Sequence, residues 1–376
     1  MRITTTTLAS AIASIALSTG SWASPQAPSF EGLGFLPTQV SPWSEAHGVS
    51  EDGETIIGFA RQSGHDWASE PFVWTSAQGM TGLGAPPLTS GTPGGRAYAV
   101  SGDGAVIVGA TDFEVEGDAS FIWRRNGSFA ALDTVRGSYR SEALAVSQDA
   151  SVIVGKSHFS GSYVSFPSHK EGIVWIDGRE RATGLFPGGF QSEARGVSGD
   201  GRIVVGQALR SKEEGQTAFR WTVEQGLVSL GDLPGGYHFS RANDASHDGS
   251  VIVGYGTISF DFATFAVDHR ACRWTASGVE ELPAVPNTYL SEAVAVTPDG
   301  QTAVGWARAP GDNRAAIWDP IHGGRDIVTV MEASGVDMSD WKMTHATAVS
   351  ADGHVVVGYG LRTSLGTREA FRAYLP

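Results

Sequence analysis

The sequence predicts an all-β fold, a seven-bladed β-propeller with four strands per blade, from three observations. A phrase of the form A-x-x-V-S-x-D-G-x-x-V-V-G occurs seven times, four strand signals accompany each copy, and the copies recur at a nearly constant period. Four short strands repeated about every 40–50 residues are typical of propeller blades. The aspartates of the seven copies are Asp52, Asp103, Asp149, Asp200, Asp248, Asp299 and Asp352, at spacings of 51, 46, 51, 48, 51 and 53.

The fourth copy shows the elements of one blade in order. Residues 194–198 form a first strand, A-x-x-V-S, and the Asp200-Gly201 pair that follows is a hairpin signal because a tight turn needs positive φ. Residues 203–206 are a β-branched second strand that ends in glycine, and residues 219–221 are an aromatic third strand. A Gly-then-Leu segment, residues 226–231, supplies the fourth strand.

We interpret the seven aspartates as turn formers and not as catalytic groups. The third copy reads Asp149-Ala150, so we expect its turn to differ slightly from the others. The first strands begin with alanine and the second strands end with glycine in all seven copies, as close approach near a crowded axis requires. The tryptophans of the third strands would bury between neighbouring blades, each contributing up to about 5 kcal/mol before entropy is counted.

The two ends of the repeat array predict how the ring closes. Residues 371–376 match a third strand with no fourth strand after it, and residues 30–37 match a fourth strand with no first three before it. Pairing of these two segments would complete the seventh blade and remove the exposed sheet edges. A linear β-solenoid is the alternative, but it leaves the two matching fragments unexplained.

Composition and charge limit the partners and the compartment. The formal net charge of −14 argues against nucleic acid and anionic membranes as partners, since both select clustered Lys and Arg. Arg2, the apolar residues 8–17 and the small residues before Ala23 read as a secretory signal, so we expect a leader at 1–23 and the propeller at 24–376. No later segment is apolar enough for a membrane span, and Cys272 is the only cysteine, which excludes an internal disulfide. We expect a secreted or periplasmic monomer.

The repeats also resemble the bacterial extracellular HAF-repeat proteins. Their pattern joins an A-F-R-W-like strand, an L-G-x-L-P-G-G stretch and the A-x-x-V-S phrase, which residues 218–221, 230–236 and 242–254 follow in that order. The sequence does not contain the His-Ala-Phe triplet after which these proteins are named; Thr217-Ala218-Phe219 is among the nearest matches. The resemblance covers essentially residues 30–376 and implies secretion and a repeat architecture, with no catalytic residues to carry over.

A candidate site follows from the strand register. Propeller sites commonly lie where each outer strand connects to the next inner strand, near the central channel. The residue before the recurrent alanine should therefore contribute to a circle at one mouth of the channel. These seven residues are Glu45, Arg96, Glu142, Glu193, Arg241, Glu292 and His345.

This predicted circle has two interpretations. In the first, its carboxylates and guanidinium groups pair with one another and hold blades together, each exposed pair contributing about 0–1 kcal/mol. In the second, the circle is a polar pocket for a charged or hydroxyl-rich ligand, with a cation held by carboxylates. It matches no defined metal motif, so no metal is named, and the sequence indicates no cofactor.

Loops between second and third strands should open on the same face. We assign residues 59–71, 156–172 and 255–270 to such loops. They are rich in aromatic residues and histidine, so we interpret them as candidate recognition surfaces. Side chains expected to flank the circle are Tyr98, His158, His169, Tyr237 and His238.

Three functions remain open from the sequence alone. The first is a secreted binding or interaction module for a glycan or a protein, acting through the channel-mouth face. The second is an extracellular polysaccharide-acting enzyme, a lyase using Arg96 with Tyr98 or Arg241 with His238, or a glycosidase using two of the glutamates. The third is a structural protein with no ligand. The chain contains no G-x-S-x-G elbow, H-E-x-x-H motif, phosphate loop or dinucleotide fingerprint.

Overall fold

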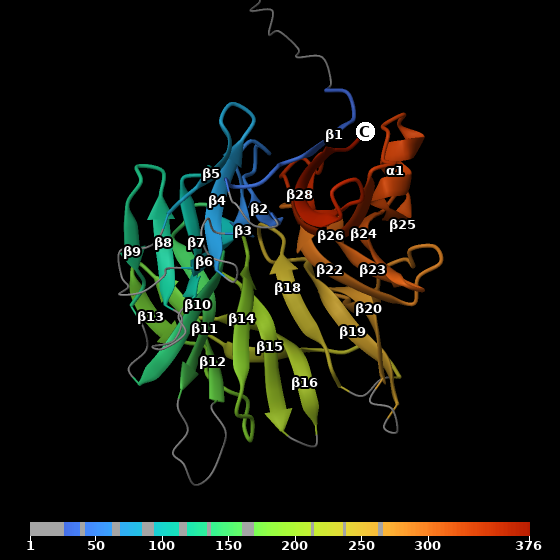
Figure 1. Cartoon of the computed structure of the whole chain (residues 1–376). Helices are drawn as coiled ribbons and strands as arrows, with labels where there is room; N and C mark the ends of the chain where they lie inside the picture. Colours follow the sequence, from blue (N-terminus) through green and yellow to red (C-terminus); the bar gives the residue numbers. More distant parts are fainter. Residues whose placement is uncertain are drawn as a thin grey trace, which may run out of the picture.

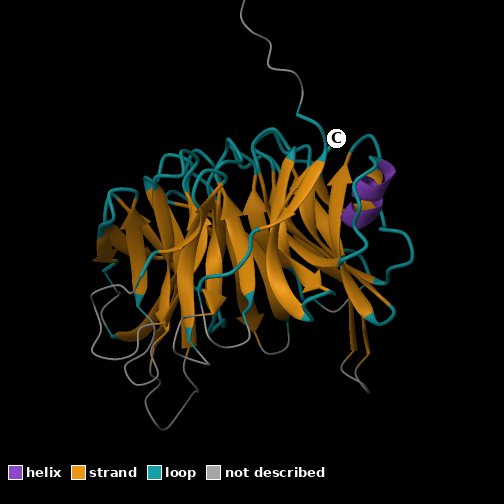
Figure 2. Cartoon of the chain, turned by 45° about the horizontal axis from the view of Figure 1, so that its top comes forward, coloured by secondary structure: helices purple, strands orange, loops and turns teal. Residues whose placement is uncertain are grey.

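The chain forms seven four-stranded antiparallel sheets arranged around a central channel, which confirms the predicted propeller (Figure 1). This computed structural model describes residues 26–37, 42–61, 68–84, 94–112, 119–133, 137–159, 169–211, 214–235, 238–261 and 266–376. Side by side, the sheets enclose the channel, with turns and loops at its two ends (Figure 2). The first strand of each blade lies innermost, and consecutive first strands contact one another all the way round.

Blades 1 to 4 follow the chain without crossovers, each in the strand order 1-2-3-4. Their strands are β2 (Ser44–Val49), β3 (Ile56–Arg61), β4 (Ser69–Thr75) and β5 (Gly79–Gly82); β6 (Gly94–Val100), β7 (Val106–Asp112), β8 (Ser120–Arg124) and β9 (Phe129–Ala131); β10 (Ser138–Val146), β11 (Val152–Phe159), β12 (His169–Ile176) and β13 (Arg179–Ala182); β14 (Ser192–Val197), β15 (Val204–Ser211), β16 (Gly215–Thr222) and β17 (Gly226–Gly231).

Blades 5 to 7 repeat the pattern, and a short helix follows the last strand of blade 6. Their elements are β18 (Arg241–Ala245), β19 (Ile252–Asp261), β20 (Ala266–Thr275) and β21 (Gly278–Glu281); β22 (Leu290–Val296), β23 (Ala303–Ala309), β24 (Asp312–Asp319), β25 (Gly323–Asp326) and α1 (Ile327–Ala333); β26 (Trp341–Val349), β27 (Val355–Arg362) and β28 (Thr367–Tyr374), which β1 (Ser29–Gly32) completes.

The seventh blade joins the two ends of the chain. Strand β1 pairs antiparallel with β28, Gly32 lying opposite Phe371, and the Leu33 N–H donates to the Ala370 carbonyl at 2.9 Å. Phe30 packs against Trp341 and Phe371, with ring centroids 4.9 and 5.8 Å apart. The three-plus-one closure expected from the sequence therefore leaves this blade with a full set of four strands.

The Asp-Gly turns share one hydrogen-bond pattern that explains the recurrent serine and aspartate. In blade 1 the Ser50 hydroxyl donates to Asp52 Oδ1 at 2.5 Å and accepts from the Thr55 N–H at 2.9 Å. The same Ser/Thr–Asp bond occurs in all seven blades. The aspartates are therefore turn formers, as predicted.

The turn of blade 3 differs less than the sequence suggested. Ala150 takes the left-handed conformation, φ 59°, that glycine adopts in the other turns, and its N–H donates to the Ser147 carbonyl at 3.0 Å. The hairpin geometry is thus retained, at the steric cost that a Cβ carries at positive φ. The expected change in the turn was wrong because the hydrogen bonds hold the backbone in place.

Small residues and aromatic rings fill the blades as expected. A Cβ at Gly58 would overlap the Glu45 carbonyl oxygen of the neighbouring first strand. Trp175, Trp274 and Trp318 are each 2% exposed, and apolar clusters join residues of adjacent blades. In the described part of the chain, no helix has the length and apolar composition that crossing a bilayer requires.

Peptide hydrogen bonds link the Asp-Gly turns around one end of the channel. In six of the seven turns, a backbone N–H donates to the carbonyl of the next blade's turn. The bonds are Glu51 to Gly102, Gly102 to Gln148, Gln148 to Gly199, Asp200 to His247, His247 to Pro298 and Ala351 to Glu51. Proline has no N–H, so Pro298 cannot donate to blade 7, and the circle is interrupted between blades 6 and 7.

Candidate ligand-binding mouth of the channel

A cavity of about 680 Å³ occupies the channel on the side where the first strands begin. Its wall comes from all seven first strands and from the second strands of blades 3, 6 and 7. The volume lies within the range of about 300–1,000 Å³ that small-molecule sites occupy. We call this region the mouth.

A collar of apolar side chains ends the mouth and separates it from a cavity of about 140 Å³ at the Asp-Gly turns. The collar comes from the valine of each A-x-x-V-S phrase, which is alanine in blade 5. Val49, Val100, Val146, Val197, Val296 and Val349 line both cavities, and Ala245 lines the smaller one.

One carboxyl, Asp244, lies at the level of the collar. It replaces the small residue of the other phrases, and its oxygens accept the backbone N–H groups of Ala245 at 2.8 Å and Val296 at 3.0 Å. Burial raises the pKa of Asp244 to about 7, although the two backbone hydrogen bonds oppose the increase. The sequence analysis did not select this residue, although the equivalent position is glycine or alanine in the six other copies, and this departure from the repeat was the available signal.

The seven residues of the predicted circle occupy one register position. Each lies in a first strand opposite the residue that follows the second-strand glycine. The pairs are Glu45 with Phe59, Arg96 with Ala110, Glu142 with Lys156, Glu193 with Gln207, Arg241 with Tyr255, Glu292 with Trp306 and His345 with Tyr359.

The circle does not line the cavity evenly. Glu142, Arg241, Glu292 and His345 line it, whereas Glu45, Arg96 and Glu193 are not part of its wall. Side chains two positions further along the first strands contribute instead, since alternate residues of a strand share a face. Those that sequence reasoning did not select are His47, Leu144, Arg195, Asn243, Val294 and Thr347.

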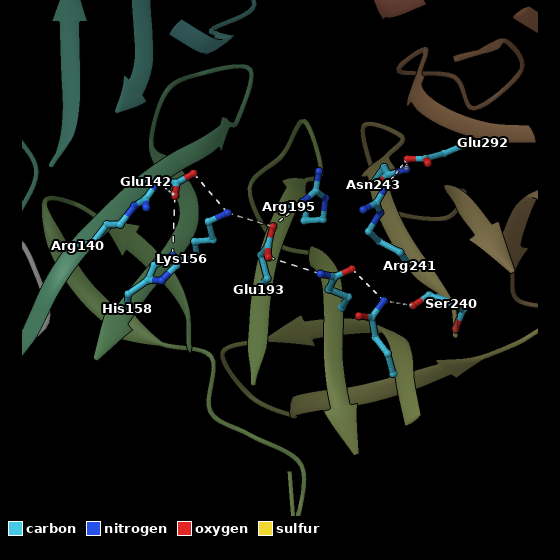
Figure 3. Close-up of polar contacts among 12 residues, drawn as sticks. Arg140, Glu142, Lys156, His158, Glu193, Arg195, Ser240, Arg241, Asn243 and Glu292 are labelled. Atoms are coloured by element: carbon cyan, nitrogen blue, oxygen red, sulfur yellow. Dashed lines mark hydrogen bonds and ion pairs between the residues drawn. The ribbon is translucent and has the colours of Figure 1, made fainter. Parts of the chain in front are cut away.

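A run of polar contacts, here called the polar chain, begins at the cavity wall and extends behind it across blades 3 to 5 (Figure 3). Lys156 Nζ lies 3.3 Å from Glu142 Oε2 and 3.6 Å from Glu193 Oε1, so it bridges two blades. Glu193 also pairs with Arg195. The chain continues through Gln207 and Gln216 to the Ser240 carbonyl, by bonds of 3.5, 3.0 and 3.3 Å.

Other charges of the circle are also engaged within the protein. Arg241 Nη2 lies 2.5 Å from Glu292 Oε1, which also accepts from Asn243 Nδ2 at 2.8 Å (Figure 3). Glu45 pairs with Arg368 of blade 7 and lies 3.3 Å from His47 Nε2. Three described glutamates of the circle are therefore joined to an adjacent blade by an ion pair, in Lys156–Glu193, Arg241–Glu292 and Arg368–Glu45.

These contacts keep two of the glutamates ionised. Burial alone would raise the pKa of Glu45, but the hydrogen bond and charge of His47 and the charge of Arg368 hold it below the ordinary value. Burial would also raise the pKa of Glu193, but the charges of Arg195 and Lys156 outweigh this effect and hold the pKa below the ordinary value. A carboxyl with a lowered pKa is a poor proton donor at neutral pH.

Aromatic and imidazole rings form a continuous series on the other side of the mouth. Neighbouring ring centroids are 4.7 to 6.4 Å apart, and the series runs through blades 5, 6, 7, 1 and 2. We call it the aromatic arc. Its members are Phe239, Tyr255, His269, Trp306, His345, Tyr359, His47, Phe59 and Tyr98.

His345 is the one imidazole of the predicted circle, and its two nitrogens are engaged. Nε2 lies 3.2 Å from Asn313 Nδ2 and Nδ1 lies 3.0 Å from Thr344 Oγ1, so Nε2 accepts and Nδ1 donates. The ring stacks on Tyr359 at 4.7 Å. Burial, and then the charge of Arg368, lower the pKa of His345 to about 4, which keeps it neutral at physiological pH.

The predicted flanking residues are dispersed. Tyr98 belongs to the arc and lines the cavity. His158 lies 3.8 Å from Glu142, and burial lowers its pKa to about 4. His169 stacks on Phe159 at 4.7 Å beyond the cavity wall, and His238 is exposed. Tyr237 lies outside the described residues, as do residues 1–25 with the expected leader.

Three segments assigned to loops are partly strands. Residues 156–159 and 169–172 continue β11 and β12, and the segments 59–71 and 255–270 likewise begin and end in paired strands. Antiparallel pairing continues past the apolar run because polar residues suit the solvated end of a sheet. Among the described residues, no group of three or more His, Cys, Asp or Glu is placed to hold a metal ion.

Comparisons with known proteins show the fold. No protein-family model matches the chain, and no curated protein matches its sequence. Solved structures that it resembles include two oligogalacturonate lyases. The one from Vibrio parahaemolyticus has a TM-score of 0.53 at 12% identity, over 93% of this chain and 98% of that one. The other, in complex with manganese, has a TM-score of 0.56 at 11% identity, over 93% and 97%.

The propeller domain of the Trilobed protease from Pyrococcus furiosus is similar to the same degree, with a TM-score of 0.54 at 11% identity over 89% and 95% of the two chains. At such low identity these likenesses establish a shared propeller fold and assign no activity.

Proposed function

We propose that this propeller is a binding module that takes a hydroxyl-rich ligand, a glycan, in the mouth of its channel. The observation that carries this proposal is the composition of the cavity wall, where partly exposed aromatic rings face polar side chains that are already oriented by hydrogen bonds. Rings that are fixed by their neighbours lose little entropy on binding, which favours recognition.

Binding is favoured over catalysis because His345, Tyr359 and Arg241, three groups of the mouth that could act in catalysis, are engaged within the protein or retain their protons. The Nε2 lone pair of His345 accepts from Asn313, and burial raises the pKa of Tyr359 to about 12. Arg241, a candidate for neutralising a uronate, is held by Glu292. A polysaccharide-acting enzyme is the second candidate, supported by the fold shared with the oligogalacturonate lyases.

The test is a glycan-panel screen with purified protein, and binding is then located with a variant that fills the cavity. Val294 lines the mouth, so Val294→Trp should abolish binding, while Val228→Trp on the exposed face of β17 should leave it unchanged. Equal binding by both variants would place the ligand elsewhere.

The same samples are monitored for unsaturated sugars by ultraviolet absorbance and for new reducing ends. Binding without product supports the module. If products are formed and Val294→Trp abolishes their formation, the protein is a polysaccharide-acting enzyme and the binding-module proposal is wrong.

We also propose that the chain is exported, as its resemblance to HAF-repeat proteins implies. The support is the leader-like composition of residues 1–23, with Arg2 before the apolar residues 8–17. N-terminal sequencing of the mature protein should give a start after Ala23. A protein retained in the cytoplasm with an intact leader would contradict this.

A further inference from the structure

The aromatic arc presents a preorganised surface to the cavity. Five of its nine members, His47, Tyr98, Trp306, His345 and Tyr359, line the mouth. Phe59 and Tyr255 are buried at the register positions opposite Glu45 and Arg241. An uninterrupted stretch of partly exposed rings runs from His269 through Trp306, His345 and Tyr359 to His47, with neighbouring centroids 4.7 to 6.2 Å apart.

The cationic groups of the cavity wall are neutralised by glutamates of the protein. Lys156, Arg195 and Arg241 line the cavity, and each lies in an ion pair, with Glu142, Glu193 and Glu292 as the partners. Asp244 also lines the cavity, with a carboxyl whose pKa is raised by burial to about 7. An anionic ligand would have to separate such a pair, and the net charge of −14 would repel it at low salt.

A cationic ligand is disfavoured for a different reason. Guanidinium groups of the chain already lie over three rings of the arc: Arg241 over Tyr255 at 4.8 Å, Arg96 over Phe59 at 5.4 Å and Arg368 over Tyr359 at 5.2 Å. These contacts occupy the faces at which a ligand cation would gain most.

We infer that the mouth takes an uncharged oligosaccharide, one pyranose stacking on Trp306 of the arc while hydroxyl groups bond to the polar side chains opposite. This inference rests on the proposed function and names its ligand class. The apolar face of a sugar ring matches an aromatic surface. Glu292, Asn243 and Lys156 supply fixed acceptors and donors for hydroxyls, without a net charge.

The experiment is titration calorimetry with two series of oligosaccharides of equal length, one uncharged and one of uronates, each at low and at high salt. The uncharged series should bind, with an affinity that changes less than about twofold between the two salt concentrations, since no net charge is neutralised. The uronates should bind more weakly at low salt.

Substitutions at Trp306 test the stacking. Trp306→Ala should weaken binding about tenfold, as truncation of a central aromatic contact does, and Trp306→Phe should restore most of the loss. Trp123→Ala is the matched control, since Trp123 lies in β8 away from the cavity wall. It should not change the affinity.

The outcomes separate the two proposals. Uronates that bind at the mouth more tightly than uncharged sugars, with an affinity that falls as salt rises, would overturn the inference and leave the binding module in place. A ligand whose binding is abolished by Val294→Trp but unchanged by Trp306→Ala would also overturn the inference and leave the binding module in place. Absence of any glycan binding, or binding that Val294→Trp does not affect, would overturn both.

Discussion

Replacing Asp244 with asparagine should make the stability of the propeller less sensitive to pH. The carboxyl lies at the collar between the two cavities, and desolvation raises its pKa to about 7 from an ordinary value of 3.8. The folded protein therefore retains a proton that the unfolded chain releases between these two values. The free energy of unfolding should fall as pH rises from about 4 to about 7 and should be constant above that window.

The magnitude follows from the two pKa values. Their difference of about three corresponds to about 4 kcal/mol at full ionisation, of which about 3 kcal/mol is lost between about pH 5 and pH 8. Asparagine stays neutral, but it can accept only one of the two backbone hydrogen bonds, from Ala245 or Val296. That loss costs about 1 kcal/mol at every pH. Asp244→Asn should therefore match the parent protein near pH 5 and exceed its stability by about 3 kcal/mol near pH 8.

Urea denaturation of both proteins, followed by tryptophan fluorescence at several pH values, measures this difference. Asp177→Asn is the control, because Asp177 is exposed in the β12–β13 turn and asparagine accepts its positive φ of 51°. A stability difference between Asp244→Asn and the parent that is the same at pH 5 and pH 8 would refute the reasoning.

Three other substitutions test features of the fold by their effect on the urea midpoint. Ala150→Gly should stabilise the protein by about 1 kcal/mol, because it relieves the positive φ of 59°; a destabilised variant would contradict the strained turn. Phe30→Ala should cost about 2 kcal/mol, and more than Phe129→Ala at the matching fourth-strand position of blade 2, since only Phe30 helps close the ring; equal losses would argue against that role. His345→Gln should reduce by about 3 kcal/mol the stability lost on acidification from pH 6.5 to 4, because the folded protein keeps this imidazole neutral; acid sensitivity equal to the parent's would count against its low pKa.

The repeat made the fold predictable to the level of strand register. Each repeat contains a tight turn, and the crowding near the axis requires small residues such as Gly58 and Ala46. The two chain ends also complement each other in one sheet. Few arrangements other than a closed ring satisfy these three constraints. The position of Glu45 and its six equivalents in the first strands followed from that register alone.

The wall of the mouth was less predictable, because it depends on residues that vary between repeats. Strand periodicity would have added His47 and Arg195 to the predicted site, because they lie two positions after Glu45 and Glu193 on the same face of their strands. Nothing in the sequence pairs Lys156 with two glutamates or links Trp306 to His345 in one series of rings. Those relations join blades about 50 residues apart.

The interruption at Pro298 has a consequence for the response of the ring to temperature. The seam between blades 6 and 7 lacks the backbone hydrogen bond that the other seams have between their turns. An apolar cluster nevertheless spans it, in which Ile327 and Met331 of α1 pack with Val304 and Phe371. Apolar burial weakens on cooling. Cold should therefore loosen this seam before the other six, and amide hydrogens of β26 should begin to exchange at temperatures where those of β14 are still protected.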